Sequence, residues 1–295
     1  MTLTQLTYFC TVCQTKSITK AARSLYVSQP AVSTAIRNLE EEFHISLFYH
    51  GGNSIKLTAE GKKFYRKAQA LMRRYQDFYS DFSSREDAPF VIRLGVPAVL
   101  SAAFFPDLLI EFRKKYDTPV TLIEARTARS CRQIKSGELD AAIVGLDYCD
   151  AELYNAHVLM RDHFMYYTSK KSPLAGKSAL TFEDLKDEPI ILYNSDSMLN
   201  DVVLARFAAM KSSPHIILQS SQLLTVLRYI TEYGGGAFLY DFMPIKYPDL
   251  IKIPLSPEIT GSIGLIWKKG VYVNHRLSEF IDFVKNYRGL PVSSS

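Results

Sequence analysis

Apolar side chains near the N-terminus recur at helical spacing in two adjoining stretches. The first stretch carries Ile18, Ala21, Ala22 and Leu25. The second follows the i, i+3, i+4, i+7 spacing of an amphipathic helix and carries Val32, Ala35, Ile36, Leu39 and Phe43. Between them Tyr26 and Val27 leave room for a turn only, Ser28 suits an N-cap and Pro30 suits a first helical turn. The pattern predicts a helix-turn-helix, although any two packed helices of a globular domain share this spacing.

The second of these helices has a polar face opposite its apolar stripe. The face combines short polar groups near the helix N-terminus with one guanidinium: Gln29, Pro30, Ser33, Thr34 and Arg37. Such groups match the base edges and phosphates of a DNA major groove. We therefore expect DNA contacts from this face, with Ser17, Lys20 and Ser28 as further contacts at the two helix starts.

A β-hairpin is predicted directly after this motif. Residues 48–50 and 54–58 are extended, and the glycine-rich segment 51–53 supplies the positive φ angles of a tight turn. A hairpin in this place is a wing, and we expect His50 and Lys56 to lie along the phosphate backbone or in a minor groove.

Residues 58–84 predict one long amphipathic helix. Its apolar positions advance in steps of 4, 3, 4, 3 and 4, which is a heptad seam formed by Phe64, Ala68, Leu71, Tyr75, Phe78 and Phe82. A small N-terminal domain cannot cover a helix of this length, so we expect the seam to pair with a second copy of the chain. The alternative is a helix that lies along the rest of its own chain.

A polar linker at residues 83–89 leads into a region of alternating strands and helices. Strands are predicted over residues 91–96, 120–124, 141–145, 166–168, 190–193, 216–219, 236–240 and 263–268. Helices are predicted over residues 101–116, 129–136, 200–211, 222–233 and 274–287. This alternation predicts parallel sheets covered on both faces, and its length implies two α/β lobes. The chain is expected to cross between the lobes near residues 159–160 and to return near 259–261.

Composition and charge add information about the partner and the compartment. The 295 residues are 47% hydrophobic and carry a formal charge of +5, yet residues 1–76 hold eleven basic and only four acidic side chains. A basic excess confined to the first quarter is expected of a segment that meets a polyanion, although a solvated basic face is the alternative. The N-terminus does not resemble a signal peptide and no apolar run reaches the ~20 residues of a membrane span, so we expect a cytoplasmic protein without membrane contact.

The segment SITKAARSLYVSQPAVSTAIRNLEEEF, followed by SLF, SIKLTAEGKKF and the long helix, closely resembles the N-terminal region of LysR-type transcriptional regulators. The resemblance continues more loosely through IRLGVP, FPDLLIEFRKKY, GELDAAIVG, SPLA and YGGGAFLYDFMP. It implies an α/β protein with a winged helix-turn-helix (1–58), a dimerising linker helix and hinge (59–88) and a two-lobe effector domain like the type 2 periplasmic binding proteins (89–295). Lobe I would hold residues 89–160 and 262–295, and lobe II residues 161–261.

The resemblance also implies partners. Such proteins bind an interrupted palindrome in double-stranded DNA as a homodimer or homotetramer, respond to a small-molecule co-inducer and have RNA polymerase as a candidate partner. The chain departs from the family at His50, where arginine is common, and at Thr34, where a long polar residue is common.

The effector site is expected between the lobes, at the carboxyl ends of strands and the N-termini of helices. Hydroxyls, an amide and backbone N–H groups recur there in the turns that hold Pro97, Ala98, Ser101, Thr127, Ala128, Arg129, Asn194, Ser195, Asp196 and Ser220. These groups suit an anion, with Arg126, Arg129 and Arg132 as candidate partners for a carboxylate. Each turn taken alone is also typical of a plain helix cap.

No enzyme motif supports catalysis, because GxSxG, Walker and HExxH sequences are absent, and no cofactor or metal site is predicted. Cys10 and Cys13 form a CxxC inside a helix predicted over residues 3–14, with Leu6 and Phe9 on the same face, so buried thiols are favoured over zinc ligands. Three rival interpretations stay open: a solute-binding protein, an enzyme on an α/β scaffold, and a redox switch that uses Cys131 or Cys149.

Overall fold

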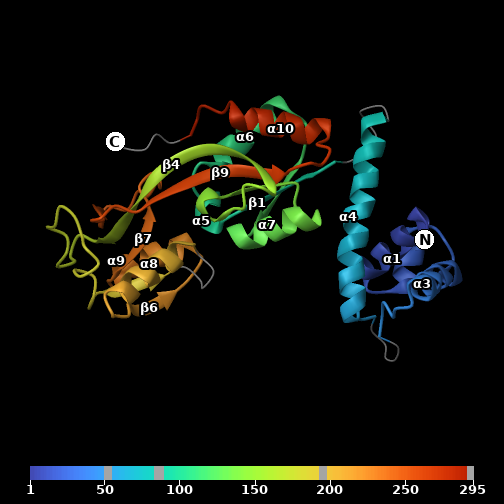
Figure 1. Cartoon of the computed structure of the whole chain (residues 1–295), viewed down its shortest axis with the longest axis horizontal. Helices are drawn as coiled ribbons and strands as arrows, with labels where there is room; N and C mark the ends of the chain where they lie inside the picture. The colour runs from blue at the N-terminus through green and yellow to red at the C-terminus, as the bar shows by residue number, and fades with distance from the viewer. Residues whose placement is uncertain (50–54, 83–89, 193–197, 291–295) are drawn as a thin grey trace. The chain divides into compact units, whose positions relative to one another are not determined.

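The computed structural model describes residues 1–49, 55–82, 90–192 and 198–290 (Figure 1). Within these residues the chain divides into two compact units, one that holds Met1–Phe90 and one formed by Val91–Lys135 and Leu139–Ser295. The first unit is helical and the second is built around a mixed sheet.

The first unit begins with three short helices, α1 (Leu3–Thr15), α2 (Ile18–Ser24) and α3 (Gln29–Phe43). The N-cap hydroxyl of α3 comes from Ser28, which accepts a hydrogen bond from the Ala31 N–H at 3.4 Å, and proline occupies the first turn. The predicted helix-turn-helix and its cap are therefore confirmed.

The apolar stripe of α3 is buried in a core shared with α1, α2 and the long helix α4 (Ala59–Phe82). Val32 and Leu39 are fully buried, whereas Phe43, at the end of the stripe, is 41% exposed. On α1 the fully buried positions are Leu6, Phe9 and Val12. Cys10 and Cys13 pack against this core but are only partly buried, whereas the sequence predicted buried thiols.

The described arms of the predicted hairpin pair at their base. A single antiparallel bridge joins Phe48 to Leu57, and the Tyr49 N–H donates to the Lys56 carbonyl at 2.9 Å. The Glu40 carboxylate of α3 accepts the Leu47 N–H at 2.7 Å and so fixes where the first arm leaves the core. His50 and the predicted turn at 51–53 lie outside the described residues.

The start of α4 is held by one hydroxyl and one glycine. Thr58 accepts the Gly61 N–H at 2.8 Å as an N-cap, and its own hydroxyl donates to the Ser46 carbonyl. A Cβ at Gly61 would lie 2.0 Å from the Leu47 carbonyl oxygen. Only glycine allows the helix to approach the wing this closely.

The heptad seam of α4 is divided between two environments, which corrects the prediction that all of it meets a second copy. Phe64 and Ala68 pack into the core of their own chain, because Phe64 lies against Phe9 with ring centroids 5.3 Å apart and Ala68 is 4% exposed. Further along, Leu71 (44%), Tyr75 (42%) and Phe78 (64%) are exposed. The side chain of Phe82 lies outside the described residues.

The described residues of the second unit form one nine-stranded sheet in the order β2-β1-β3-β9-β4-β7-β5-β6, with β8 paired to β4. The strands are β1 (Ile92–Val96), β2 (Val120–Glu124), β3 (Ala141–Gly145), β4 (Tyr154–Ser169), β5 (Pro189–Leu192), β6 (His215–Gln219), β7 (Gly236–Tyr240), β8 (Leu250–Pro254) and β9 (Thr260–Lys268). The outer strands are parallel as predicted, but β9 and β4 run antiparallel to their neighbours. The prediction of parallel sheets is therefore wrong for the pairs formed by β4 and β9.

Helices cover both lobes of this sheet: α5 (Ala98–Ser101), α6 (Phe105–Lys115), α7 (Thr127–Ser136), α8 (Met198–Ala209), α9 (Leu223–Glu232) and α10 (His275–Lys285), with the 3-10 turn η1 (Leu146–Tyr148) after β3. Figure 1 shows α6 and α10 side by side, where the rings of Phe112 and Phe280 meet edge to face at 5.0 Å. The helix predicted over residues 101–116 begins later, at Phe105, and residues 98–101 form the separate short helix α5. The proline in the first turn of α6 prevents the two from joining.

The strands β4 and β9 carry the chain between the lobes. Residues 154–163 of β4 pair with β9, and residues 164–169 pair with β7 and β8. The sequence predicted only short parts of these strands and missed β8. The cause is visible in β4, where buried and exposed side chains alternate irregularly and the register shifts between Val158 and Met160.

We expect Gly61→Ala to lower the free energy of unfolding by about 1–3 kcal/mol, as overpacking at a tight contact does. Thermal unfolding of the full chain measures it. Gly176→Ala is the matched control, because nothing lies within 4 Å of a Cβ at Gly176. Equal midpoints for the two variants would show that the contact between α4 and Leu47 is not tight.

Candidate nucleic-acid interface and ligand pocket

The polar face predicted on α3 is exposed. Gln29, Pro30, Thr34 and Arg37 are exposed and Ser33 is partly so, whereas the opposite stripe is buried. The face therefore projects rigidly from a packed helix, and short side chains near its start leave room for close approach of a second molecule. Arg37 lies 3.8 Å from the exposed carboxylate of Glu41, one helical turn away.

Two residues that the sequence did not single out belong to this surface. The Thr19 hydroxyl of α2 donates to the Gln29 side-chain oxygen at 3.1 Å and so orients the first polar group of α3. Tyr26 occupies the turn with φ +56° and is 96% exposed. Its exposure could not be predicted because an aromatic residue in a turn usually packs inward.

The other predicted contacts lie around this face. Ser17 caps α2 by accepting the Lys20 N–H at 3.3 Å, and Lys20 is exposed. Lys56 is exposed on the described wing arm. Within α2 and α3 no acidic side chain stands in the first turn, so the positive ends of both helix dipoles are uncompensated there.

A cavity of about 400 Å³ lies in the second unit, bordered by both lobes. Turns after β1, β2 and β3 contribute one wall, and β4, β7, the start of α8 and the approach to α9 contribute the other. The lining residues are Pro97, Ala98, Val99, Leu100, Glu124, Ala125, Arg126, Thr127, Ala128, Arg129, Arg132, Gly145, Tyr148, Phe164, Leu199, Asp201, Ser221, Phe238, Leu239 and Tyr240.

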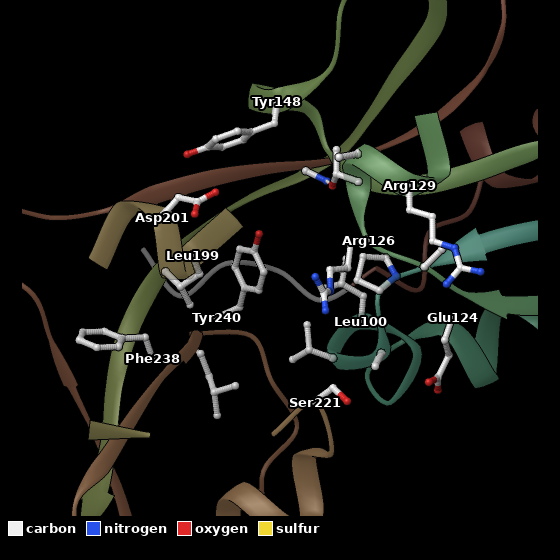
Figure 2. Close-up of a pocket in the computed structure, with 18 of the residues that line it drawn as sticks. Leu100, Glu124, Arg126, Arg129, Tyr148, Leu199, Asp201, Ser221, Phe238 and Tyr240 are labelled. Atoms are coloured by element: carbon white, nitrogen blue, oxygen red, sulfur yellow. Dashed lines mark hydrogen bonds between the residues drawn. The ribbon is translucent and has the colours of Figure 1, made fainter. Parts of the chain in front are cut away.

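The cavity combines an aromatic interior with charges of both signs. Figure 2 shows the Tyr240 ring between Leu199 and the Arg126 guanidinium, with Arg129 and Glu124 at one end and Tyr148 near Asp201 at the other. Burial, followed by the Asp147 and Asp162 carboxylates, raises the pKa of Tyr240 above its ordinary value. Tyr240 therefore keeps its proton at neutral pH.

Tyr148 shares this behaviour at the cavity edge. Burial, then the charge of Asp201 and of Asp147, raises the pKa of Tyr148. The two phenols therefore stay neutral and can donate hydrogen bonds. The guanidinium groups of Arg126, Arg129 and Arg132 carry the positive charge, on the wall opposite Tyr240.

The structure gathers five of the predicted effector residues at this cavity: Pro97, Ala98, Thr127, Ala128 and Arg129. Ser101 does not line it, because its hydroxyl donates to the Ala98 carbonyl at 2.8 Å inside α5. Ser220 does not line it either, since its hydroxyl accepts the Gln222 N–H at 3.2 Å, and Ser221 lines the cavity instead. Asn194, Ser195 and Asp196 lie outside the described residues.

The aromatic wall was missed from sequence. Phe238 and Tyr240 belong to β7, whose five residues are all buried, and a fully apolar strand looks like ordinary core. The rings of Phe164 and Tyr240 pack against each other with centroids 4.2 Å apart, and the two residues are paired across β4 and β7. Their position at the lobe junction could be known only from the pairing.

Other chemistry is sparse among the residues that the structure describes. No group of three or more His, Cys, Asp or Glu side chains there could hold a metal ion. None of the described helices is long and apolar enough to cross a membrane. Burial raises the pKa of the Cys10 thiol to about 11 and that of Cys13 to about 12, so both stay protonated at neutral pH.

Comparison with protein families matches both units. The family model described as "Bacterial regulatory helix-turn-helix protein, lysR family" covers residues 3–62, and the one described as "LysR substrate binding domain" covers residues 90–288.

Individual proteins agree with the family matches. The uncharacterized HTH-type transcriptional regulator YwbI of Bacillus subtilis is 30% identical over 304 residues, covering 100% of this chain and 99% of its own. The HTH-type transcriptional regulator BenM of Acinetobacter baylyi is 30% identical over 203 residues, which cover 68% of this chain and 66% of BenM. A full-length OxyR variant from Pseudomonas aeruginosa superimposes with a TM-score of 0.75 at 21% identity, covering 100% and 98%. The structure of full-length CbnR in complex with its target DNA superimposes with a TM-score of 0.68 at 18% identity, and the match covers 97% of this chain and 99% of CbnR.

Proposed function

Because the chain belongs to the LysR family of bacterial transcriptional regulators, DNA-binding proteins with an effector-binding domain, we propose that it contacts DNA through the exposed face of α3 and holds an anionic effector in the cavity. The observation that carries the first half is the polar face of α3, exposed on a helix whose other side is locked in a core. Short side chains on a rigid helix can enter a major groove without large losses of side-chain freedom.

Within this face the roles follow from chemistry. Gln29, oriented by the Thr19 hydroxyl, suits a base edge because an amide can both donate and accept. Arg37 lies two turns along α3 and suits a phosphate or a guanine. Phosphates on either side of this face are proposed to be contacted by Ser17, Lys20 and Lys56. His50 is proposed as a further DNA contact.

The exposed half of the α4 seam supports a dimer. Leu71 and Tyr75 are exposed apolar side chains on one face of a helix, and covering such a stripe is favourable in proportion to its apolar area. We propose that two α4 helices pair there, which gives two α3 helices for an interrupted palindrome, and that two dimers form a tetramer. Its working compartment is proposed to be the cytoplasm, and no catalytic role is proposed.

The cavity supports an effector with a carboxylate and an apolar body. The anion would meet the arginine wall, and the body would lie on Phe238 and Tyr240. An effector that touches both lobes binds best when they are close together, and this differential affinity can shift how the dimers hold DNA.

We expect Arg37→Ala to weaken binding of promoter DNA and to lower the slope of log K against log salt by roughly one counterion. A salt titration of binding by fluorescence anisotropy measures both. Lys170→Ala is the control, since it removes the same charge from an exposed site in the second unit. An unchanged slope in Arg37→Ala would contradict a phosphate contact.

Leu71→Glu is expected to dissociate the dimer, because pairing would place two carboxylates against an apolar seam. Sedimentation velocity over a concentration series would show the shift toward monomer. Gln76→Glu adds the same charge at an exposed position of α4 outside the seam. If both variants sediment like the parent chain, the seam is not the interface.

A small carboxylate that fits the cavity should raise the thermal midpoint of the full chain by mass action, equivalent to about 2.7 kcal/mol at a hundred times its Kd. Benzoate, glutamate and acetate form the first panel. Leu199→Trp, which fills the cavity, should abolish the shift, and Arg129→Ala should reduce it. A shift that survives Leu199→Trp would place binding elsewhere.

A further inference from the structure

Two cysteines in the second unit lie with their sulfur atoms in contact. The Sγ atoms of Cys131 and Cys149 are 3.4 Å apart, although the residues are 18 positions apart in sequence. A disulfide bond is about 2.05 Å long, so the two sulfur atoms need to approach by about 1.4 Å to become bonded. Both residues are partly buried, which leaves them open to a small oxidant.

The fold holds this pair in place through separate anchors. Cys131 lies on α7, where its carbonyl accepts a hydrogen bond from the Tyr154 hydroxyl at 2.8 Å. Cys149 closes η1, and its N–H donates to the Leu146 carbonyl at 3.0 Å. Both side chains pack against one apolar cluster, formed by Ile134, Leu139, Ala142, Val144, Tyr154 and Ile266. The contact is therefore set by tertiary packing.

The two thiols differ in character. The hydrogen-bonding contact with the Cys149 thiol, partly opposed by burial, lowers the pKa of Cys131. The same bond and burial raise the pKa of Cys149. The thiolate is the nucleophilic form of cysteine, so this difference favours Cys131 as the attacking group and Cys149 as the resolving one.

We propose that Cys131 and Cys149 are a modification site for hydroperoxides, which convert the pair reversibly into a disulfide. The Cys131 thiolate attacks one peroxide oxygen, the O–O bond breaks, and the leaving oxygen departs as water (or an alcohol) after taking a proton. The resulting sulfenic acid is attacked by the Cys149 sulfur, which loses its proton, and a second water leaves. The two thiols are oxidised by two electrons and the peroxide is reduced by two, and a dithiol reductant reverses the change.

The position of the pair gives the modification a consequence at the cavity. Cys131 lies on α7 between the cavity-lining Arg129 and Arg132, and Cys149 directly follows the cavity-lining Tyr148. A disulfide would tie α7 to η1 and restrict one wall of the cavity. That this alters effector affinity rests on the proposed function, whereas the disulfide itself does not.

Peptide mapping by mass spectrometry of the full chain, before and after one equivalent of hydrogen peroxide, tests the chemistry. We expect two of the four thiols to be lost, a cross-linked Cys131–Cys149 peptide to appear, and dithiothreitol to restore both thiols. Cys10 and Cys13 are the internal control and should stay reduced. Four remaining thiols, or a disulfide between other cysteines or between chains, would overturn the proposal.

Cysteine variants distinguish the attacking thiol from the resolving thiol, and hydrogen exchange tests the effect on the cavity wall without any ligand. In Cys149→Ser, Cys131 should stop at a sulfenic acid that dimedone traps, and Cys131→Ser should react far more slowly. Amide hydrogen exchange of the parent chain should slow several-fold at residues 127–129 and 146–148 on oxidation. Unchanged exchange there would overturn the link to the cavity wall. Neither measurement needs an effector or DNA, so failure of the proposed function would be seen separately.

Discussion

The antiparallel pairing of β4 with β9 is the constraint on which the second unit depends. These two strands pass from one lobe to the other, and β4 changes partner from β9 to β7 and β8 between His163 and Phe164. The change of partner places Phe164 against Tyr240 at the junction. Gly261 leaves room for both side chains, because a Cβ added at this position would lie 3.1 Å from each of them. The aromatic interior of the cavity is therefore a consequence of how the sheet is continued.

The helices of the N-terminal unit could be predicted because their signals are local. Apolar residues recur every three or four positions, and Ser28 and Thr58 stand where their own helices begin. The prediction that failed in this unit was the partner of the heptad seam of α4. A heptad pattern says which face of a helix is apolar but not which neighbour covers it, and the core of the same chain takes Phe64 and Ala68 before a second copy can.

Part of the cavity lining could be predicted from the sequence, and the differences between predicted and observed lining residues have physical causes. Turns after parallel strands meet at one sheet edge, which is why Thr127 to Arg129 and Pro97 were found. Ser101 and Ser220 do not line the cavity because their hydroxyls already bond to nearby backbone, a competition that sequence does not reveal. The Phe238 and Tyr240 wall follows from strand order, which depends on contacts between residues far apart in the sequence.

Effector and oxidant, as proposed, would act on the same wall by different means. A ligand between the lobes gains from contacts on both sides, so it can change their separation, and coupling of this kind is typically worth about 1–3 kcal/mol. The disulfide would join α7 to η1 within one lobe and would form no link between the lobes. It cannot close the cavity by itself, but it can fix the arginine wall in one position before the ligand arrives. Because a wall ordered in advance no longer loses that freedom on binding, oxidation would strengthen effector binding if the fixed position is the bound one and weaken it otherwise.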